Sequence, residues 1–272
     1  MKKNINIIKL LEESIEENES HNIGLYGGKA FSEFKKEDFN FIFDYVELNG
    51  NDLNVVEFVS FCTCKFWDII STIKYKEEFW GRKFIEFNFL ELLFSKAENI
   101  LFSYNLLIQS KQYEQAFSIF RNYIELSSII FACSLDKDFF EKYTSNTETE
   151  QEDIEMWFKH LKPSKISNFL KSRKGKDINK IENYSIDRFT GEQRATLYKY
   201  TSEISHSKFK SLKNNKDFNE MMVFSTDFLV NSTLLIHIIN YDNLNYNSDK
   251  DERKLQIIVN LWIKILYGHI LK

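Results

Sequence analysis

The chain has 272 residues, of which 43% are hydrophobic and 16% aromatic, so it is long enough to bury a sizeable core. Its formal net charge of −4 excludes a global cationic field that would attract nucleic acid, and any such binding has to be local. The 8 glycines and single proline are too few for folds built on many turns, which leaves an all-α fold of long helices.

Apolar residues recur at helical spacing along most of the chain, and clusters of Asp, Asn, Ser and Gly separate these stretches. A single domain is expected, a multi-helix bundle of long antiparallel helices whose core is formed by residues 82–134 and 191–241. Helices are predicted over residues 3–18, 38–47, 52–74, 82–110, 112–134, 137–143, 149–161, 164–172, 191–213, 216–241 and 249–271.

Residues 144–190 differ in character from the bundle. The run TSNTETEQEDIE is acidic and the run KPSKISNFLKSRKGKD is strongly basic, so a peripheral, partly mobile charged excursion is expected. The basic run is typical of a solvated surface; alternatively it contacts RNA phosphates or pairs with the acidic run, within the molecule or across a dimer. The cations proposed for RNA binding include Lys171, Arg173 and Lys174. The few apolar anchors of the excursion are Trp157, Phe158, Leu161, Phe169 and Leu170.

The three cysteines form neither an even disulfide framework nor a Cys-x-x-Cys pair, as is typical of a reducing compartment. The N-terminus lacks the apolar run and cleavage site of a signal peptide, and Asn, Ser and His interrupt the most apolar window, FLVNSTLLIHIINY. A cytoplasmic protein without a membrane partner is therefore expected. No metal-ligand spacing, phosphate loop or nucleophile elbow is present, so neither a metal nor another cofactor is expected.

The predicted helix 112–134 carries a charged pair at the edge of its apolar half. Arg121 lies just outside the apolar arc, and Glu125 follows one helical turn later. Such a pair is typical of a solvated surface, where it stabilises a helix by about 0.3 kcal/mol. The functional alternative is that Arg121 holds a phosphate or a carboxylate.

The predicted helix 191–213 carries a second polar edge. Ser202 and His206 lie one turn apart beside an apolar arc that includes Ala195 and Tyr198. One interpretation is a histidine packed at the rim of the bundle, with a ring nitrogen bonded to Ser202 or to a neighbouring helix. The other is that this edge faces the charged pair described above, so that the imidazole acts as a general acid or base in a groove between helices.

Two stretches resemble a known group of proteins. IFRNYIELSSIIFACSLDKDFFEKY resembles the Arg-x-x-x-Glu helix of bacterial all-helical families related to HEPN domains, and LYKYTSEISHSKF is similar to the Tyr, Ser and His helix that follows in them. Many HEPN domains are ribonucleases of toxin–antitoxin or antiphage systems, with Arg and His on one helix. Here residues 126–128 are Leu, Ser and Ser, so the resemblance implies a composite site. In it His206 is the acid or base, Arg121 clamps phosphate, and Glu125, Tyr198 and Ser202 complete the cluster.

Two functions stay open on these grounds. The first is an RNA-directed effector of a bacterial defence or toxin system, which could act as a ribonuclease. The second is a non-catalytic module of the same fold that binds a partner protein or forms a homodimer through an aromatic helix face. A small-ligand sensor with a pocket between helices is a third possibility. A catalytic site predicts that Arg121 and His206 come within about 6 Å of each other or of a shared cleft.

Overall fold

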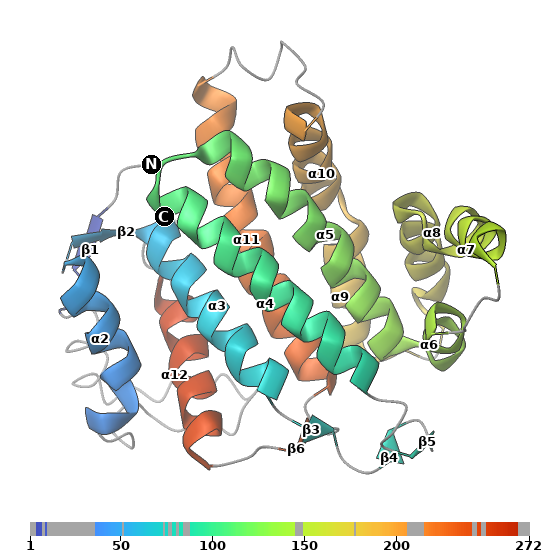
Figure 1. Ribbon diagram of the computed structural model, residues 1–272, viewed down its shortest axis with the longest axis horizontal. Coiled ribbons are helices and arrows are strands. Elements are labelled where there is room, and N and C mark those ends of the chain that lie inside the picture. Colours follow the sequence, from blue (N-terminus) through green and yellow to red (C-terminus); the bar gives the residue numbers. More distant parts are fainter. Residues whose placement is uncertain are drawn as a thin grey trace.

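The computed structural model describes residues 4–6, 9, 36–50, 52–72, 74–75, 78–79, 82–83, 88–144, 149–176, 178–205, 215–240, 244–245 and 249–265. The prediction of an all-α multi-helix bundle is confirmed (Figure 1). The helices are η2 (Lys36–Phe39), α2 (Asn40–Asn49), α3 (Val55–Thr72), α4 (Asn88–Gln109), α5 (Tyr113–Leu135), α6 (Lys137–Thr144), α7 (Glu150–Met156), the π-helix η4 (Trp157–Leu161), α8 (Pro163–Arg173), α9 (Lys180–Thr190), α10 (Glu192–Ser205), α11 (Asn215–Asn240) and α12 (Asp249–Ile265).

The strands of the described part have at most three residues, and each pairs antiparallel with one other. They are β1 (Asn4–Asn6) with β2 (Asp52–Asn54), β3 (Lys74–Tyr75) with β6 (Leu244–Asn245), and β4 (Glu78–Phe79) with β5 (Arg82–Lys83). The helices predicted from residues 3, 52 and 82 are therefore wrong at their starts. Asn and Asp in the first two of these segments are weak helix formers, and the two segments pair with each other instead. Arg82–Lys83 pairs with the nearby Glu78–Phe79. Most of the predicted helix 3–18 lies outside the described residues.

The core of the bundle lies where α3, α5 and α11 meet, and it contains a connected set of polar side chains. The Trp67 indole donates a hydrogen bond to Thr233 Oγ1 over 3.1 Å. The Tyr123 hydroxyl lies 2.8 Å from Thr233 Oγ1 and 2.9 Å from Ser232 Oγ. All four side chains are buried, so each bond forms away from water and fixes how the three helices are rotated against one another.

Helix α11 is long and apolar enough to cross a membrane over Glu220–Asn240, where the mean hydropathy is 1.5. The Asn, Ser and His interruptions thus lower its hydropathy less than predicted from the sequence. In this structure 61% of that window is buried inside the protein. The core helix of a soluble protein meets the same criterion of length and composition, so one such helix is weak evidence for a membrane span.

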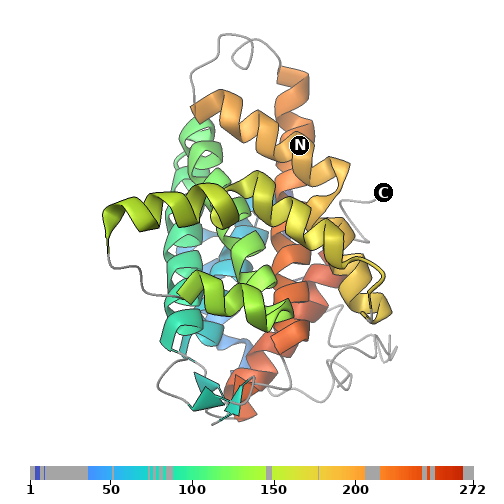
Figure 2. The same ribbon diagram turned by 90° about the vertical axis from the view of Figure 1, so that its right-hand side faces the viewer.

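Two helices of the charged segment are packed on the bundle. Helix α8 buries Ile166 and Leu170, and α9, which was not predicted, buries Ile186 and Phe189. The Phe189 ring stacks on that of Phe131 with 4.5 Å between centroids. Figure 2 shows the continuous run of α7, η4 and α8 crossing the side of the bundle.

The expectation that Trp157 and Phe158 anchor the charged segment is wrong. Their side chains are 45% and 56% exposed. Both residues belong to η4, whose wider turn separates α7 from α8, and the two rings contact each other edge to face at 5.0 Å. The predicted anchor Leu170 is buried, together with Ile166, in α8, which begins at a proline suited to the first turn of a helix.

Candidate functional site

The facing sides of α5 and α10 share a hydrogen-bonded cluster of Arg121, Glu125 and Tyr198. The Tyr198 hydroxyl donates to Glu125 Oε1 over 2.8 Å, and Arg121 Nε donates to the same oxygen over 3.2 Å. Arg121 Nη2 also donates to the Tyr198 hydroxyl over 3.3 Å. The side chains of the ion pair are only 26% and 31% exposed. The ion pair of Arg121 and Glu125 therefore lies between α5 and α10, and both of its side chains are hydrogen-bonded to Tyr198.

The protonation of this cluster follows from its contacts. Burial would lower the pKa of Arg121, but hydrogen bonds and charge from Tyr198 and Glu125 outweigh it and raise that pKa. Burial raises the pKa of Tyr198, and the bond to the Glu125 carboxylate raises it further. The Tyr198 hydroxyl is therefore protonated at neutral pH and acts as a donor to Glu125.

A second arginine belongs to this cluster and was not among the predicted site residues. The Arg194 guanidinium lies over the Tyr198 ring, 5.1 Å from its centroid, and the Arg121 guanidinium lies over the same ring at 5.3 Å. Arg194 is only 8% exposed, and its Nε has no hydrogen-bond partner. Among the described residues no carboxylate forms an ion pair with it. Burial lowers its pKa, although the charge of Glu125 acts in the opposite direction.

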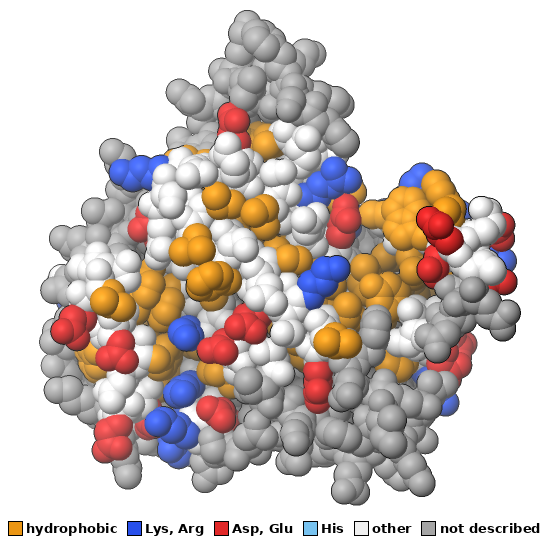
Figure 3. All heavy atoms as spheres, viewed as in Figure 1, with side chains coloured by type: hydrophobic (Ala, Val, Ile, Leu, Met, Phe, Trp, Pro, Cys, Tyr) orange, Lys and Arg blue, Asp and Glu red, His pale blue; other side chains and the backbone are white. Residues whose placement is uncertain are grey.

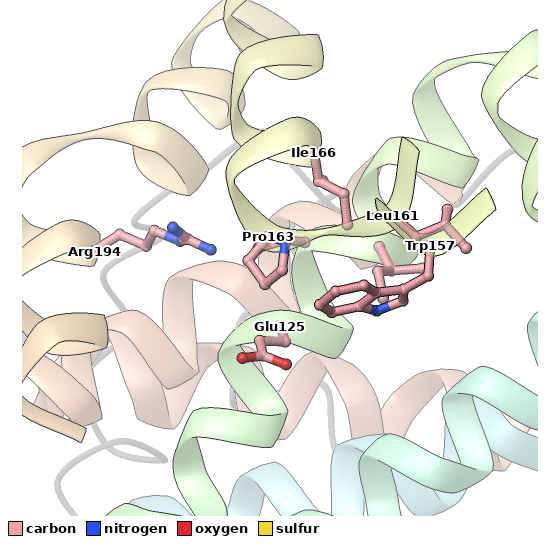
Figure 4. A pocket seen from close by; sticks show the side chains of 8 residues that line it. Glu125, Trp157, Leu161, Pro163, Ile166 and Arg194 are labelled. Carbon is pink, nitrogen blue, oxygen red and sulfur yellow. The ribbon is translucent and has the colours of Figure 1, made fainter. Parts of the chain in front are cut away.

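Arg194 lines a pocket of about 60 Å³ between the bundle and the crossing helices. The lining comprises Glu125, Ser128 and Ile129 of α5, Trp157 and Leu161 of η4, Pro163 and Ile166 of α8, and Arg194 of α10 (Figure 4). Figure 3 shows hydrophobic side chains gathered where the segment containing α7 and α8 meets the bundle. One wall belongs to the π-helix η4, and π-helical turns occur frequently at functional sites.

The chemistry of the pocket is mostly apolar, with a few converging polar groups. Arg194 supplies N–H donors, and the Glu125 carboxylate supplies an acceptor. The Ser128 hydroxyl already donates to the Ile124 carbonyl over 2.8 Å, so toward the pocket it can only accept. Apolar walls with a few polar groups are the lining composition of small-molecule sites, although this pocket is smaller than most of them. In the described part of the chain, no three His, Cys, Asp or Glu side chains cluster as ligands for a metal ion.

The buried stripe of α10 is rotated relative to the predicted one. It runs through Arg194, Leu197 and Thr201, which are all buried, whereas Ala195, assigned to the apolar arc, is exposed. The spacing of three and four residues from Arg194 to Leu197 and Thr201 is the signal that could have identified Arg194. It was missed because an arginine was not expected on the packed side of a helix.

Of the two other site residues predicted on this helix, Ser202 lies within the described residues and His206 does not. Ser202 is half-buried, and Ser205 lies 3.1 Å from Ser118 of α5 through their hydroxyl oxygens, which brings this end of α10 onto α5. His206 lies outside the described residues, so its predicted approach to Arg121 stays a prediction.

The cations proposed to bind RNA are partly used inside the molecule. Arg173 pairs with Asp136 over 3.0 Å, and Lys174 pairs with Asp187 over 2.6 Å. Lys171 is exposed. The pairs that the structure shows for this segment are thus made with α9 and with the junction of α5 and α6, not with the acidic run that precedes η4.

Comparison with protein-family models, with curated proteins and with solved structures finds no match to this chain.

Proposed function

We propose that the protein is a non-catalytic binding module that holds the anionic end of a small ligand in the pocket between α5, η4, α8 and α10. The observation that carries this proposal is Arg194, a cation that is 8% exposed, lines the pocket and has an unpartnered Nε. The described residues give this guanidinium the Tyr198 ring and the charge of Glu125 but no ion pair, so its N–H donors are available to an anion that arrives from solution. A guanidinium suits this role because its planar N–H donors match a carboxylate or a phosphate.

The neighbouring groups favour recognition over catalysis. Tyr198 has a raised pKa and donates to Glu125, which makes it a poor base. Glu125 Oε1 already accepts two hydrogen bonds, and a guanidinium does not exchange protons near neutral pH. The RNA-directed effector stays a hypothesis that requires His206 to act with Arg121.

Calorimetric titration of the full chain tests the proposal with inorganic phosphate, isocaproate and L-leucine as probes. We expect at least one probe to bind, and Arg194→Met to weaken that binding by at least about tenfold, because a charge-assisted hydrogen bond is lost. Lys171→Met is the matched control, since it removes an exposed cation of the same charge and should leave affinity unchanged. The proposal is wrong if no probe binds, or if the bound probe is unaffected by Arg194→Met.

A further inference from the structure

The pocket presents two opposite charges that do not pair with each other. Arg194 and Glu125 both line it, yet no ion pair or hydrogen bond joins them. Figure 4 shows the Arg194 side chain entering from α10 and the Glu125 carboxylate from α5, with Pro163 beside them and Trp157 on the side away from Arg194. A ligand placed there therefore meets a donor and an acceptor of opposite charge.

The Glu125 carboxylate is used asymmetrically. Its Oε1 accepts from the Tyr198 hydroxyl and from Arg121 Nε, whereas no hydrogen bond within the described residues reaches Oε2. The Glu125 side chain is 31% exposed, so Oε2 is open to a further donor, which a simple carboxylate ligand would not supply. A doubly charged phosphate would in addition be repelled by the Glu125 charge, because like charges brought together in a water-poor site are costly.

We infer that the ligand of this pocket is a zwitterionic α-amino acid with an apolar side chain. Its carboxylate accepts from Arg194, and its ammonium donates to Glu125 Oε2. These two groups are attached to one carbon atom, so a single small ligand can offer both to the two charged groups that line the pocket. The inference rests on the proposed function, and it adds the class of ligand to it.

The remaining walls indicate the third substituent of the ligand. Beyond the two charged groups and Ser128, the lining is apolar: Ile129, Trp157, Leu161, Pro163 and Ile166. Trp157 is 45% exposed, so one wall of the pocket reaches the surface of the molecule. An apolar side chain laid along this wall is removed from water, whereas a charged or strongly polar one would lose its hydration without gaining a partner.

Titration with a matched set of leucine analogues tests the inference. Isocaproate is leucine without its amino group, and isoamylamine is leucine without its carboxylate. We expect L-leucine to bind at least about tenfold more tightly than either, because each analogue leaves one pocket charge without its partner. Glu125→Gln should weaken leucine binding while leaving isocaproate binding unchanged or tighter. Trp157→Ala, at a half-exposed position, should weaken binding of leucine more than binding of glycine.

The outcomes separate this inference from the proposed function. If isocaproate binds as tightly as leucine, the inference of a zwitterionic ligand is wrong while the anion-binding function stands. The same conclusion follows if phosphate binds best and Glu125→Gln improves its binding. If no probe binds to the wild-type chain, both are wrong. If Glu125→Gln fails to fold, the affinities of the wild-type chain for leucine, isocaproate and isoamylamine are sufficient to test the zwitterionic ligand.

Discussion

Replacing Arg194 with methionine is expected to stabilise the protein. Methionine keeps an unbranched side chain of similar length but removes a guanidinium that is 8% exposed and has an unpartnered Nε. An unsatisfied buried polar group costs about 1–3 kcal/mol, and more when it is charged. The lost contact with the Tyr198 ring offsets about 1–2 kcal/mol of that gain. The free energy of unfolding should therefore rise by about 1 kcal/mol.

The control for this substitution is the other largely buried arginine of the site region. Arg188 is ion-paired with Asp227, both being less than one-fifth exposed, and it donates to Gln193 over 2.5 Å. Arg188→Met leaves the Asp227 carboxylate without its cation and should lower the free energy of unfolding by about 2–4 kcal/mol. Urea denaturation followed by circular dichroism measures both variants.

The opposite effects of the two substitutions would identify Arg194 as a residue kept for binding. A loss of more than about 1 kcal/mol in Arg194→Met would refute this reasoning, because it would mean that Arg194 stabilises the fold through contacts with its neighbours. The stability gain should also disappear at ligand concentrations well above both dissociation constants, since binding that is at least about tenfold tighter stabilises the wild-type chain by at least about 1.4 kcal/mol more than the variant.

Three further predictions concern other parts of the structure. Tyr198→Phe keeps the ring under both guanidinium groups but removes the hydroxyl bonded to Glu125, so unfolding should become easier by about 1–2 kcal/mol; an unchanged urea midpoint would contradict this. Burial lowers the pKa of His237 from 6.5 to about 3. The unfolded chain then binds the additional proton between these values, and stability falls as the pH decreases. His237→Leu should reduce the stability difference between about pH 7 and about pH 5 by about 2 kcal/mol, and an equally steep dependence in this variant would argue against it. Burial also raises the pKa of all three cysteine thiols, so a thiol reagent should label them only after unfolding, whereas rapid labelling of the native chain would contradict their burial.

The sequence predicted the long helices of the bundle because their apolar periodicity is local. Helix α5 follows this pattern: Phe117, Phe120 and Ile124 are predicted on one face and are all buried. Strands β1 and β2 were not predictable in this way, because the pairing of Asn4–Asn6 with Asp52–Asn54 joins residues far apart in the chain. The apolar pattern of one segment contains no information about which distant segment will pair with it as a strand.

Helix α9 could have been predicted from local signals. Asn179 accepts from the Glu182 backbone, and Glu182 accepts from the Asn179 backbone, which forms a complete capping box. Ile186 and Phe189 then follow at helical spacing and are buried. The strongly charged composition of residues 144–190 obscured this pattern.

The site was predicted in part. The pairing of Arg121 with Glu125 follows from helical spacing, and Tyr198 was placed with them by the hypothesis that the polar edges of the two helices face each other. Arg194 was missed because helical projection assigns the buried face from apolar residues, and a buried cation is invisible to that criterion. The pocket itself depends on how α8 and η4 pack against α5, which no single helix encodes.

The most direct test of the binding function is NMR spectroscopy of the arginine side chains. The Nε–Hε resonance of Arg194, assigned by its disappearance in Arg194→Lys, should shift when L-leucine or isocaproate is added to the full chain. Arg173 and Arg253, which are paired with Asp136 and Asp38 and do not line the pocket, serve as internal references and should not move. A ligand-induced shift at Arg194 is the predicted result, and an Arg194 resonance that stays in place at saturating ligand would contradict the proposed function.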